Sequence, residues 1–161
     1  MNILKRGQAW GFDLLVASII FIGGIFVFYI YSLNFPNETE DIINRLTNEG
    51  NIVANALLSE GFPSNWNAGN VVTPGITSNN KINQTKLERF YDFSTGDYEK
   101  TKSLFNTPYE YYITFSENVT ISGNEISSMG KSPLNQRNLI KISRITIYKD
   151  KLITINVQIW E

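Results

Sequence analysis

The sequence of 161 residues contains no cysteine and no histidine, and these two absences exclude several classes of function. Without cysteine the chain forms no disulfide framework and offers no thiol nucleophile, so the fold must be held by core packing. Without histidine it builds neither a Ser-His-Asp triad nor the Cys and His ligand sets of zinc fingers. The formal net charge of −1 gives no basic surface for nucleic acid, so we expect no nucleic-acid partner.

The sequence also lacks the short motifs that carry enzyme chemistry, since it has no phosphate-binding glycine loop and no nucleophile elbow. An oxygen-ligand calcium site in the Asn-rich loops would need an acidic ligand spacing that is missing. Acid–base chemistry would have to come from carboxylates such as Asp92, Asp97 or Glu99. Solvated charges on helix surfaces explain these carboxylates better. We therefore predict a protein that is not an enzyme, with no catalytic site, no cofactor and no metal.

Charged side chains are missing from one long stretch, which runs from Leu14 to Leu33. A helix of this length spans roughly 30 Å, the thickness of the hydrocarbon core of a bilayer. The stretch is longer than the apolar region of a cleaved secretory signal, about 7–15 residues, and no small-residue cleavage pattern follows it. Lys5 and Arg6 precede it and favour a cytoplasmic N-terminus. We therefore predict a single-pass anchor in the cytoplasmic membrane, with the C-terminal domain outside the cell.

The junction just before this stretch, Lys5-Arg6-Gly7-Gln8, places two basic residues and a glycine directly ahead of the apolar helix. It resembles the leader of archaeal type IV pilins, in which a short basic peptide ends in glycine and the mature chain begins with glutamine. The resemblance covers residues 5 to about 33 and is architectural beyond them. It implies that a prepilin-type leader peptidase cuts between Gly7 and Gln8 on the cytoplasmic face, and that the apolar helix then stays in the lipid bilayer.

The same resemblance implies a domain organisation, partners and a function. The segments would be a leader over residues 1–7, a transmembrane anchor over residues 8–34 and an extracytoplasmic α+β domain over residues 35–161. The partners would be the leader peptidase, an assembly platform and like subunits. The protein would then be a structural subunit that assembles into, primes or caps a pilus-like surface filament or pseudopilus.

One position departs from the family pattern. Pilins usually have a glutamate at the fifth mature position, where it neutralises the amino terminus of a neighbouring subunit. Here that position is Phe12, and the acid is Asp13, which one residue turns by about 100° around the helix. Asp13 either pairs with such an amino terminus as a subunit contact or sits at headgroup level without a role. The departure favours a minor, tip or stand-alone subunit over a major one.

Beyond the anchor the sequence predicts an amphipathic helix packed on an antiparallel sheet, an α+β, pilin-like fold. Pro36 breaks the first helix, and apolar residues then recur at helical spacing from Asn37 to Glu60, with an interruption at Gly50. Shorter helices are predicted over residues 86–93 and 98–105. Strands are predicted over residues 109–115, 118–122, 139–148 and 152–160, and a polar loop over residues 123–138.

The last two predicted strands form the clearest β signal, and we expect a hairpin through Lys149-Asp150-Lys151. The apolar alternation slips in the first of them, and a β-bulge near Ser143-Arg144 would repair it. Trp66 lies in a loop rich in Gly, Pro and Asn, where it either stacks on a sugar or pins the loop to the core. The second role is the ordinary one for a loop tryptophan.

Asn37, Asn83 and Asn118 each begin an Asn-X-Thr sequence, the acceptor pattern for N-glycosylation on the exported side of a membrane. Roughly three such patterns arise by chance in this composition, so the prediction of glycosylation depends on the topology. Two other function classes stay open. One is an anchored surface sensor or adhesin that does not polymerise and binds a ligand through the loops around Trp66 and Gly130. The other is an anchored hydrolase that uses the carboxylates named above.

Overall fold

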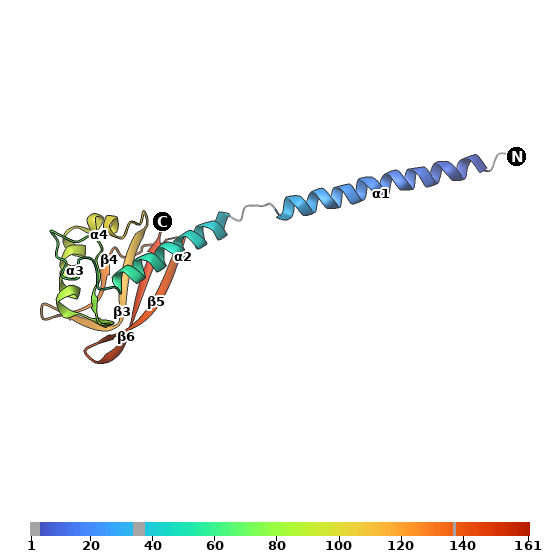
Figure 1. Ribbon diagram of the computed structural model, residues 1–161. Coiled ribbons are helices and arrows are strands. Elements are labelled where there is room, and N and C mark those ends of the chain that lie inside the picture. Colours follow the sequence, from blue (N-terminus) through green and yellow to red (C-terminus); the bar gives the residue numbers. More distant parts are fainter. Residues whose placement is uncertain (1–3, 34–37, 137) are drawn as a thin grey trace. The chain divides into compact units, whose positions relative to one another are not determined.

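A computed structural model of the chain describes residues 4–33, 38–136 and 138–161 (Figure 1). The chain divides into two compact units, Met1–Glu38 and Thr39–Glu161. The described part of the first unit is dominated by one helix, α1 (Leu4–Leu33), and from Trp10 to Leu33 its side chains are exposed. Ser18 Oγ donates to the carbonyl of Leu14 at 2.8 Å, so this hydroxyl is satisfied within the helix.

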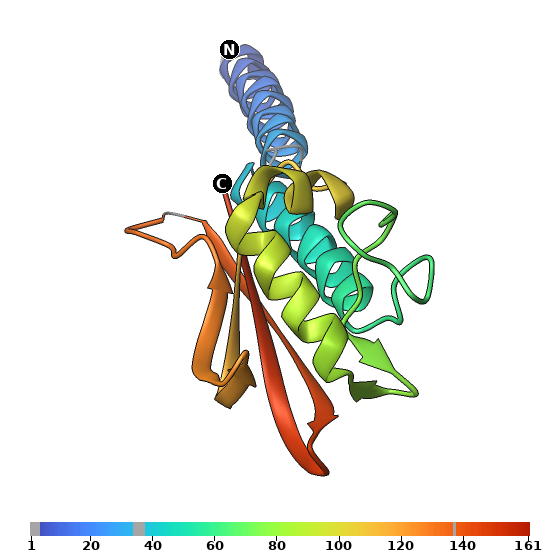
Figure 2. The same ribbon diagram turned by 90° about the vertical axis from the view of Figure 1, so that its left-hand side faces the viewer.

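The second unit packs helices against a six-stranded sheet, so the prediction of an α+β domain is confirmed, although the sheet is antiparallel in most of its pairs rather than in all. The strand order is β1-β2-β5-β6-β3-β4, and every neighbouring pair is antiparallel except β2 and β5. Figure 2 shows α2 and α3 lying together over the sheet. The elements are α2 (Glu38–Leu57), β1 (Thr77–Ser78), β2 (Lys81–Ile82), α3 (Gln84–Gly96), α4 (Tyr98–Leu104), β3 (Glu110–Ile121), β4 (Asn124–Gly130), β5 (Leu139–Tyr148) and β6 (Lys151–Trp160).

Helix α2 packs closely against the sheet at Gly50, which lies on its buried face. A Cβ added there would lie 2.8 Å from Cγ1 of Ile142 on β5 and 3.3 Å from Cγ2 of Ile159 on β6. The prediction that Gly50 interrupts the apolar face is therefore wrong, because the missing side chain is what lets the helix settle on the two strands. The same face of α2 buries the side chains of Leu46, Val53, Ala54 and Leu57.

Two sequence predictions fail around β3 and β4. Strand β3 is continuous where two strands were expected, and its pairing with β4 shifts register between Thr114 and Val119. Strand β4 lies inside the segment expected to be a loop. The polar composition of β4 gave no strand pattern in the sequence, because this edge strand buries only the side chain of Met129. Its other residues are held by backbone hydrogen bonds to β3.

The hairpin of β5 and β6 is confirmed, and it is regular throughout. Its register runs from Leu139 opposite Trp160 to Tyr148 opposite Lys151 without a shift, so the predicted bulge near Ser143-Arg144 is wrong. The alternation slips because Arg144 takes an inward position, where its guanidinium donates to Asn51 Oδ1 of α2 at 2.7 Å, while Ile145 is 71% exposed. The turn consists of Lys149 and Asp150 at φ 48° and 62°, the geometry of a type I′ turn.

Trp66 fastens the long loop between α2 and β1 to the core. Its side chain is completely buried, and its Nε1 donates to the carbonyl of Gly75 at 2.8 Å. Arg89 of α3 donates in turn to the carbonyl of Trp66 at 2.8 Å. The expected structural role of this tryptophan is therefore confirmed, since no ring face is left for a ligand.

Lys86, on the first turn of α3, holds the two ends of the same loop together. Its side chain is buried, and its Nζ donates to the carbonyls of Glu60 and Thr77, both at 2.8 Å. Two strong acceptors thus satisfy an amine that would otherwise be costly to bury. The loop is consequently closed by backbone carbonyls that converge on one ammonium group.

Candidate functional site

The most distinctive functional feature of the chain is the apolar part of α1. The 24 residues Trp10–Leu33 form a helix long and apolar enough to cross a membrane, and none of the most apolar part is buried within the structure. A helix that is hydrophobic on all sides belongs either in a protein core or in lipid. The length, composition and exposure of this helix are compatible with a transmembrane or signal anchor.

The three residues that the pilin resemblance singled out all lie on α1. Gly7 and Gln8 fall in its first turns, and Asp13 follows on the exposed part of the helix. Asp13 borders a shallow hollow formed with Trp10, Leu14 and Ala17. The carboxylate thus lies at the start of the apolar span.

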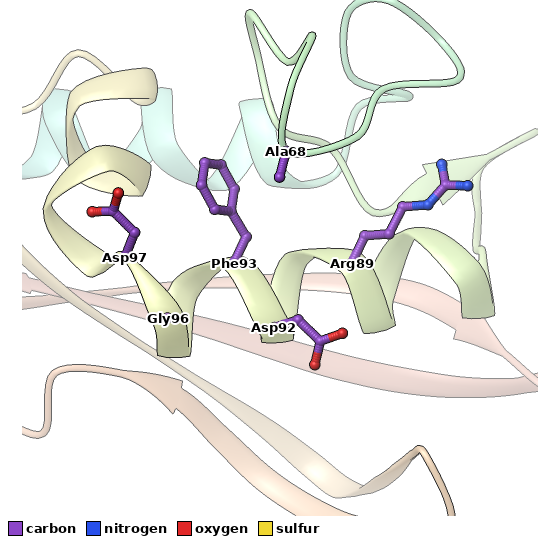
Figure 3. Close-up of a pocket in the computed structure, with 6 residues that line it drawn as sticks. All are labelled: Ala68, Arg89, Asp92, Phe93, Gly96 and Asp97. Atoms are coloured by element: carbon purple, nitrogen blue, oxygen red, sulfur yellow. The ribbon is translucent and has the colours of Figure 1, made fainter.

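The carboxylates considered for acid–base chemistry do not form a pair. Asp92 and Asp97 border one hollow of about 350 Å³, but Figure 3 shows their carboxylates pointing away from each other, with Phe93 between them. Asp97 Oδ1 accepts from the backbone N–H of Lys100 at 3.1 Å and so caps α4. Glu99 does not border this hollow, and its Oε2 lies 3.8 Å from Lys102 Nζ. The geometry gives these groups structural and solvated roles.

The candidate glycosylation acceptors differ in their surroundings. Asn83 is the N-cap of α3, and its Oδ1 accepts from the backbone N–H of Lys86 at 3.1 Å. Asn118 is exposed at the register shift of β3, and its Nδ2 donates to Glu125 Oε2 at 3.0 Å. Asn37 lies outside the described residues. Of the two described acceptors, Asn118 is the accessible one.

A polar cluster that sequence reasoning missed joins α4 to the sheet. The carboxylate of Glu110 on β3 accepts from Lys102 Nζ at 2.9 Å and lies 3.4 Å from Lys131 Nζ. Burial alone would raise the pKa of Glu110, but hydrogen bonds from Lys102 and Tyr98 and the charges of both lysines hold that pKa below its usual value. The cluster has no local sequence signal, because α4 must fold back on β3 to bring Lys102 to Glu110, and Lys131 comes from the end of β4.

Two tyrosines complete this cluster. The hydroxyl of Tyr98 accepts from the backbone N–H of Tyr111 at 2.9 Å, and the hydroxyl of Tyr111 is hydrogen bonded to Thr101. Burial is the main cause that raises the pKa of both tyrosines far above the ordinary value, and the charge of Glu110 adds to it. Both phenols therefore stay neutral and act as fixed hydrogen-bonding groups.

A groove of about 490 Å³ lies beside the cluster, between the helices and the edge of the sheet. Its helix side is formed by Tyr91, Ser94, Thr95 and Tyr98, and its strand side by residues 128–131. Gly130, which the adhesin interpretation named, thus borders a real hollow, whereas the Trp66 ring is buried. Tyrosine rings, hydroxyl groups and Lys131 give the groove a mixed polar and apolar surface.

Neither a family model, nor a curated protein, nor a solved structure matches this chain. Within the described residues, no group of three or more His, Cys, Asp or Glu side chains could hold a metal ion. The described chain combines an apolar helix of membrane-spanning length with an α+β domain that has a groove at its sheet edge.

Proposed function

We propose that this protein is a membrane-anchored, type IV pilin-like structural subunit that assembles into, primes or caps a pilus-like filament or pseudopilus. The observation that carries the proposal is the N-terminal arrangement. The junction Lys5-Arg6-Gly7-Gln8 lies at the start of α1, and the apolar side chains of this helix are exposed over Trp10–Leu33. Such a helix needs either lipid or the same helix of neighbouring subunits to cover it.

In this proposal α1 crosses the cytoplasmic membrane once, with Lys5 and Arg6 on the inner side and the unit Thr39–Glu161 outside the cell. Covering a large apolar side chain stabilises the covered state by about 1.5–3 kcal/mol. The described part of α1 exposes many such side chains, which supports stable anchoring before assembly and close helix packing after it. A leader peptidase and an assembly platform are the further partners of this function.

Asp13 is the one acidic residue near the start of the apolar span. An ionised carboxylate at the centre of a bilayer costs on the order of 2.5–3.5 kcal/mol, so a carboxylate that enters the apolar region requires a partner. We infer that this partner is the amino group that cleavage creates on Gln8 of a neighbouring subunit. The contact would join successive subunits through their anchor helices.

The proposal is tested by the mature N-terminus of the protein expressed in a host that has a prepilin-type leader peptidase. N-terminal sequencing of membrane fractions should find Gln8 as the first residue. A Gly7→Val variant should retain Met1, because the peptidase requires glycine at the cut. Gly11→Val is the matched control, since a side chain at Gly11 meets no atom within 4 Å and the cut lies elsewhere.

Three outcomes would contradict the proposal. An intact N-terminus on the wild-type protein would favour an uncut surface sensor or adhesin. Normal maturation of Gly7→Val would show that the cut is not at Gly7. A start beyond Leu33 would show that α1 is a secretory signal rather than an anchor.

A further inference from the structure

The two edges of the sheet are built differently. At one edge β1 has only two residues, Thr77–Ser78, and very short edge strands are a common protection against pairing with another chain. At the other edge β4 has seven residues, Asn124–Gly130, and pairs only with β3 in the described chain. Its stretch Ile126–Gly130 carries no charge and no proline, the usual protective devices. Strand β4 is therefore an open edge.

The register of β3 and β4 shows which backbone groups face outward. Lys131 N–H donates to the carbonyl of Tyr111 at 3.1 Å, so residue 131 occupies a position of the antiparallel ladder whose backbone groups face β3. Hydrogen-bonded and non-hydrogen-bonded pairs alternate along such a ladder. Met129 therefore bonds toward Ile113 on β3, whereas the N–H and C=O groups of Ser128 and Gly130 point away from β3.

The groove runs along these outward-facing groups. Its strand side consists of four consecutive residues, 128–131. Because side chains of a strand alternate between its two faces, a wall of consecutive residues means that the backbone edge itself borders the groove. In the described chain no hydrogen bond reaches the outward N–H and C=O groups of Ser128 and Gly130. The groove thus offers two N–H donors and two C=O acceptors, on Ser128 and Gly130, at the spacing that a further strand would need for pairing with β4.

We propose that this edge binds β4 of a second copy of the chain, so that two sheets join in antiparallel fashion about a two-fold axis at Met129. Ser128 of each copy then pairs with Gly130 of the other, and four hydrogen bonds satisfy all of the free groups. This inference stands apart from the proposed pilin-like function, since it concerns only the domain outside the anchor.

Charge complementarity favours a second copy over an unrelated strand. Glu125 lies near the beginning of β4 and Lys131 just after its end, and both side chains are exposed. In the two-fold register Lys131 of one copy lies opposite Ser127 of the other and diagonal to Glu125. Diagonal neighbours on adjacent strands are within reach of long side chains, so two opposite-charge pairs flank the four hydrogen bonds. The small side chains of Ser127, Ser128 and Gly130 leave room for close approach.

The absence of native cysteine makes disulfide trapping a direct test. In the proposed register Ser127 and Lys131 of opposite copies form a non-hydrogen-bonded pair, with Cα atoms about 4.5 Å apart, which a disulfide bridges. Within one copy these positions lie roughly 13 Å apart along the strand and cannot be bridged. The full-length S127C/K131C variant in detergent micelles, oxidised and analysed on a non-reducing gel, should yield mostly disulfide-linked dimer.

The matched control is K141C/I145C, which has the same spacing on an exposed face of β5, a strand inside the sheet. Disulfide formation in this control reports only collisions between copies that their α1 helices bring together in one micelle, so it should give little dimer. Adding Ser128→Pro to S127C/K131C should lower the dimer to the control level, because it removes an N–H that faces away from β3. Thermal unfolding of this variant should remain close to that of its parent.

A second variant keeps the test decisive if proline disturbs the fold. Glu125 is exposed, so Glu125→Lys should leave the fold intact and place like charges at both ends of the paired strands. Analytical ultracentrifugation of otherwise wild-type protein in micelles should show a dimer weakened on the order of tenfold. Dimer from S127C/K131C no greater than from the control would overturn the inference. The inference would also be overturned if Ser128→Pro left the disulfide-linked dimer of S127C/K131C unchanged and Glu125→Lys left the dimer measured by ultracentrifugation unchanged.

Discussion

The crossing of two chain segments at Gly61 and Gly75 gives the sharpest stability prediction. A Cβ added to Gly75 would lie 2.3 Å from the backbone N of Gly61 and 2.4 Å from the backbone O of Ser59. These atoms belong to the main chain, so no side-chain rotation relieves the collision. In the Gly75→Ala variant the two segments must move apart by roughly 1 Å to restore ordinary contact distances.

The cost follows from the hydrogen bonds that cross the same place. Ile76 N–H donates to the carbonyl of Leu57 at 2.8 Å, and Trp66 Nε1 donates to the carbonyl of Gly75 at 2.8 Å. Losing both bonds costs about 1–3 kcal/mol, since each is worth about 0.5–1.5 kcal/mol. The steric strain adds about 1–3 kcal/mol. We therefore expect Gly75→Ala to lower the free energy of unfolding by about 2–6 kcal/mol, a large part of a typical total of about 5–15 kcal/mol.

Urea unfolding of the full chain in detergent, followed by near-ultraviolet circular dichroism, measures this change because the signal reports aromatic packing in the domain. Gly96→Ala is the control, since a Cβ there meets no atom within 4 Å at the last residue of α3. This variant should be more stable than wild type by about 0.4–1 kcal/mol. A free energy of unfolding for Gly75→Ala within about 1 kcal/mol of the wild-type value would refute the close approach of Gly75 to Ser59 and Gly61.

Three further variants test the polar cluster and the hairpin. The pKa of Glu110 is lowered in the folded state, so Glu110→Gln should cost most above about pH 5, and the difference in urea unfolding should shrink as the pH falls below 4. The pKa of Tyr98 is raised by burial, so wild type should lose stability above about pH 10 more steeply than Tyr98→Phe, as thermal unfolding at alkaline pH would show. Lys149→Asn combined with Asp150→Gly should raise the free energy of unfolding by about 1 kcal/mol in urea, because both positions have positive φ. The hairpin variant loses the Lys81–Asp150 ion pair, which is exposed and contributes little to stability. A Glu110→Gln difference that does not change with pH would contradict the lowered pKa of Glu110. A hairpin variant less stable than wild type would contradict the turn geometry.

Much of the fold could be predicted because several elements carry strong local signals. The apolar spacing of α2 and the alternation of β6 are both properties of short stretches. Boundaries were less certain, since α2 ends at Leu57 rather than Glu60, where the chain turns toward the loop held by Lys86. Helix α2 and strand β6 could be predicted because each places apolar side chains regularly on one buried face.

The missed features all depend on contacts between distant residues. Strand β4 exists because β3 offers it a partner, and Gly50 is buried because β5 and β6 lie beneath it. The groove and the cluster at Glu110 form only when α4, β3 and the end of β4 come together. Gly130, named from its loop composition, borders the groove, but the open backbone edge beside it has no signature in side-chain identity. The N-terminal junction is the opposite case, since its interpretation rests on sequence pattern alone.

The hydrogen bonds of Lys86 determine how the stability of its loop depends on salt concentration. Its ammonium group donates to two peptide carbonyls, those of Glu60 and Thr77, rather than relying on an opposite charge. Dissolved ions screen the attraction between exposed charges over distances of about 8–10 Å at moderate ionic strength, but they screen a buried hydrogen bond much less. We therefore expect the loop to remain fastened from dilute buffer to strong brine.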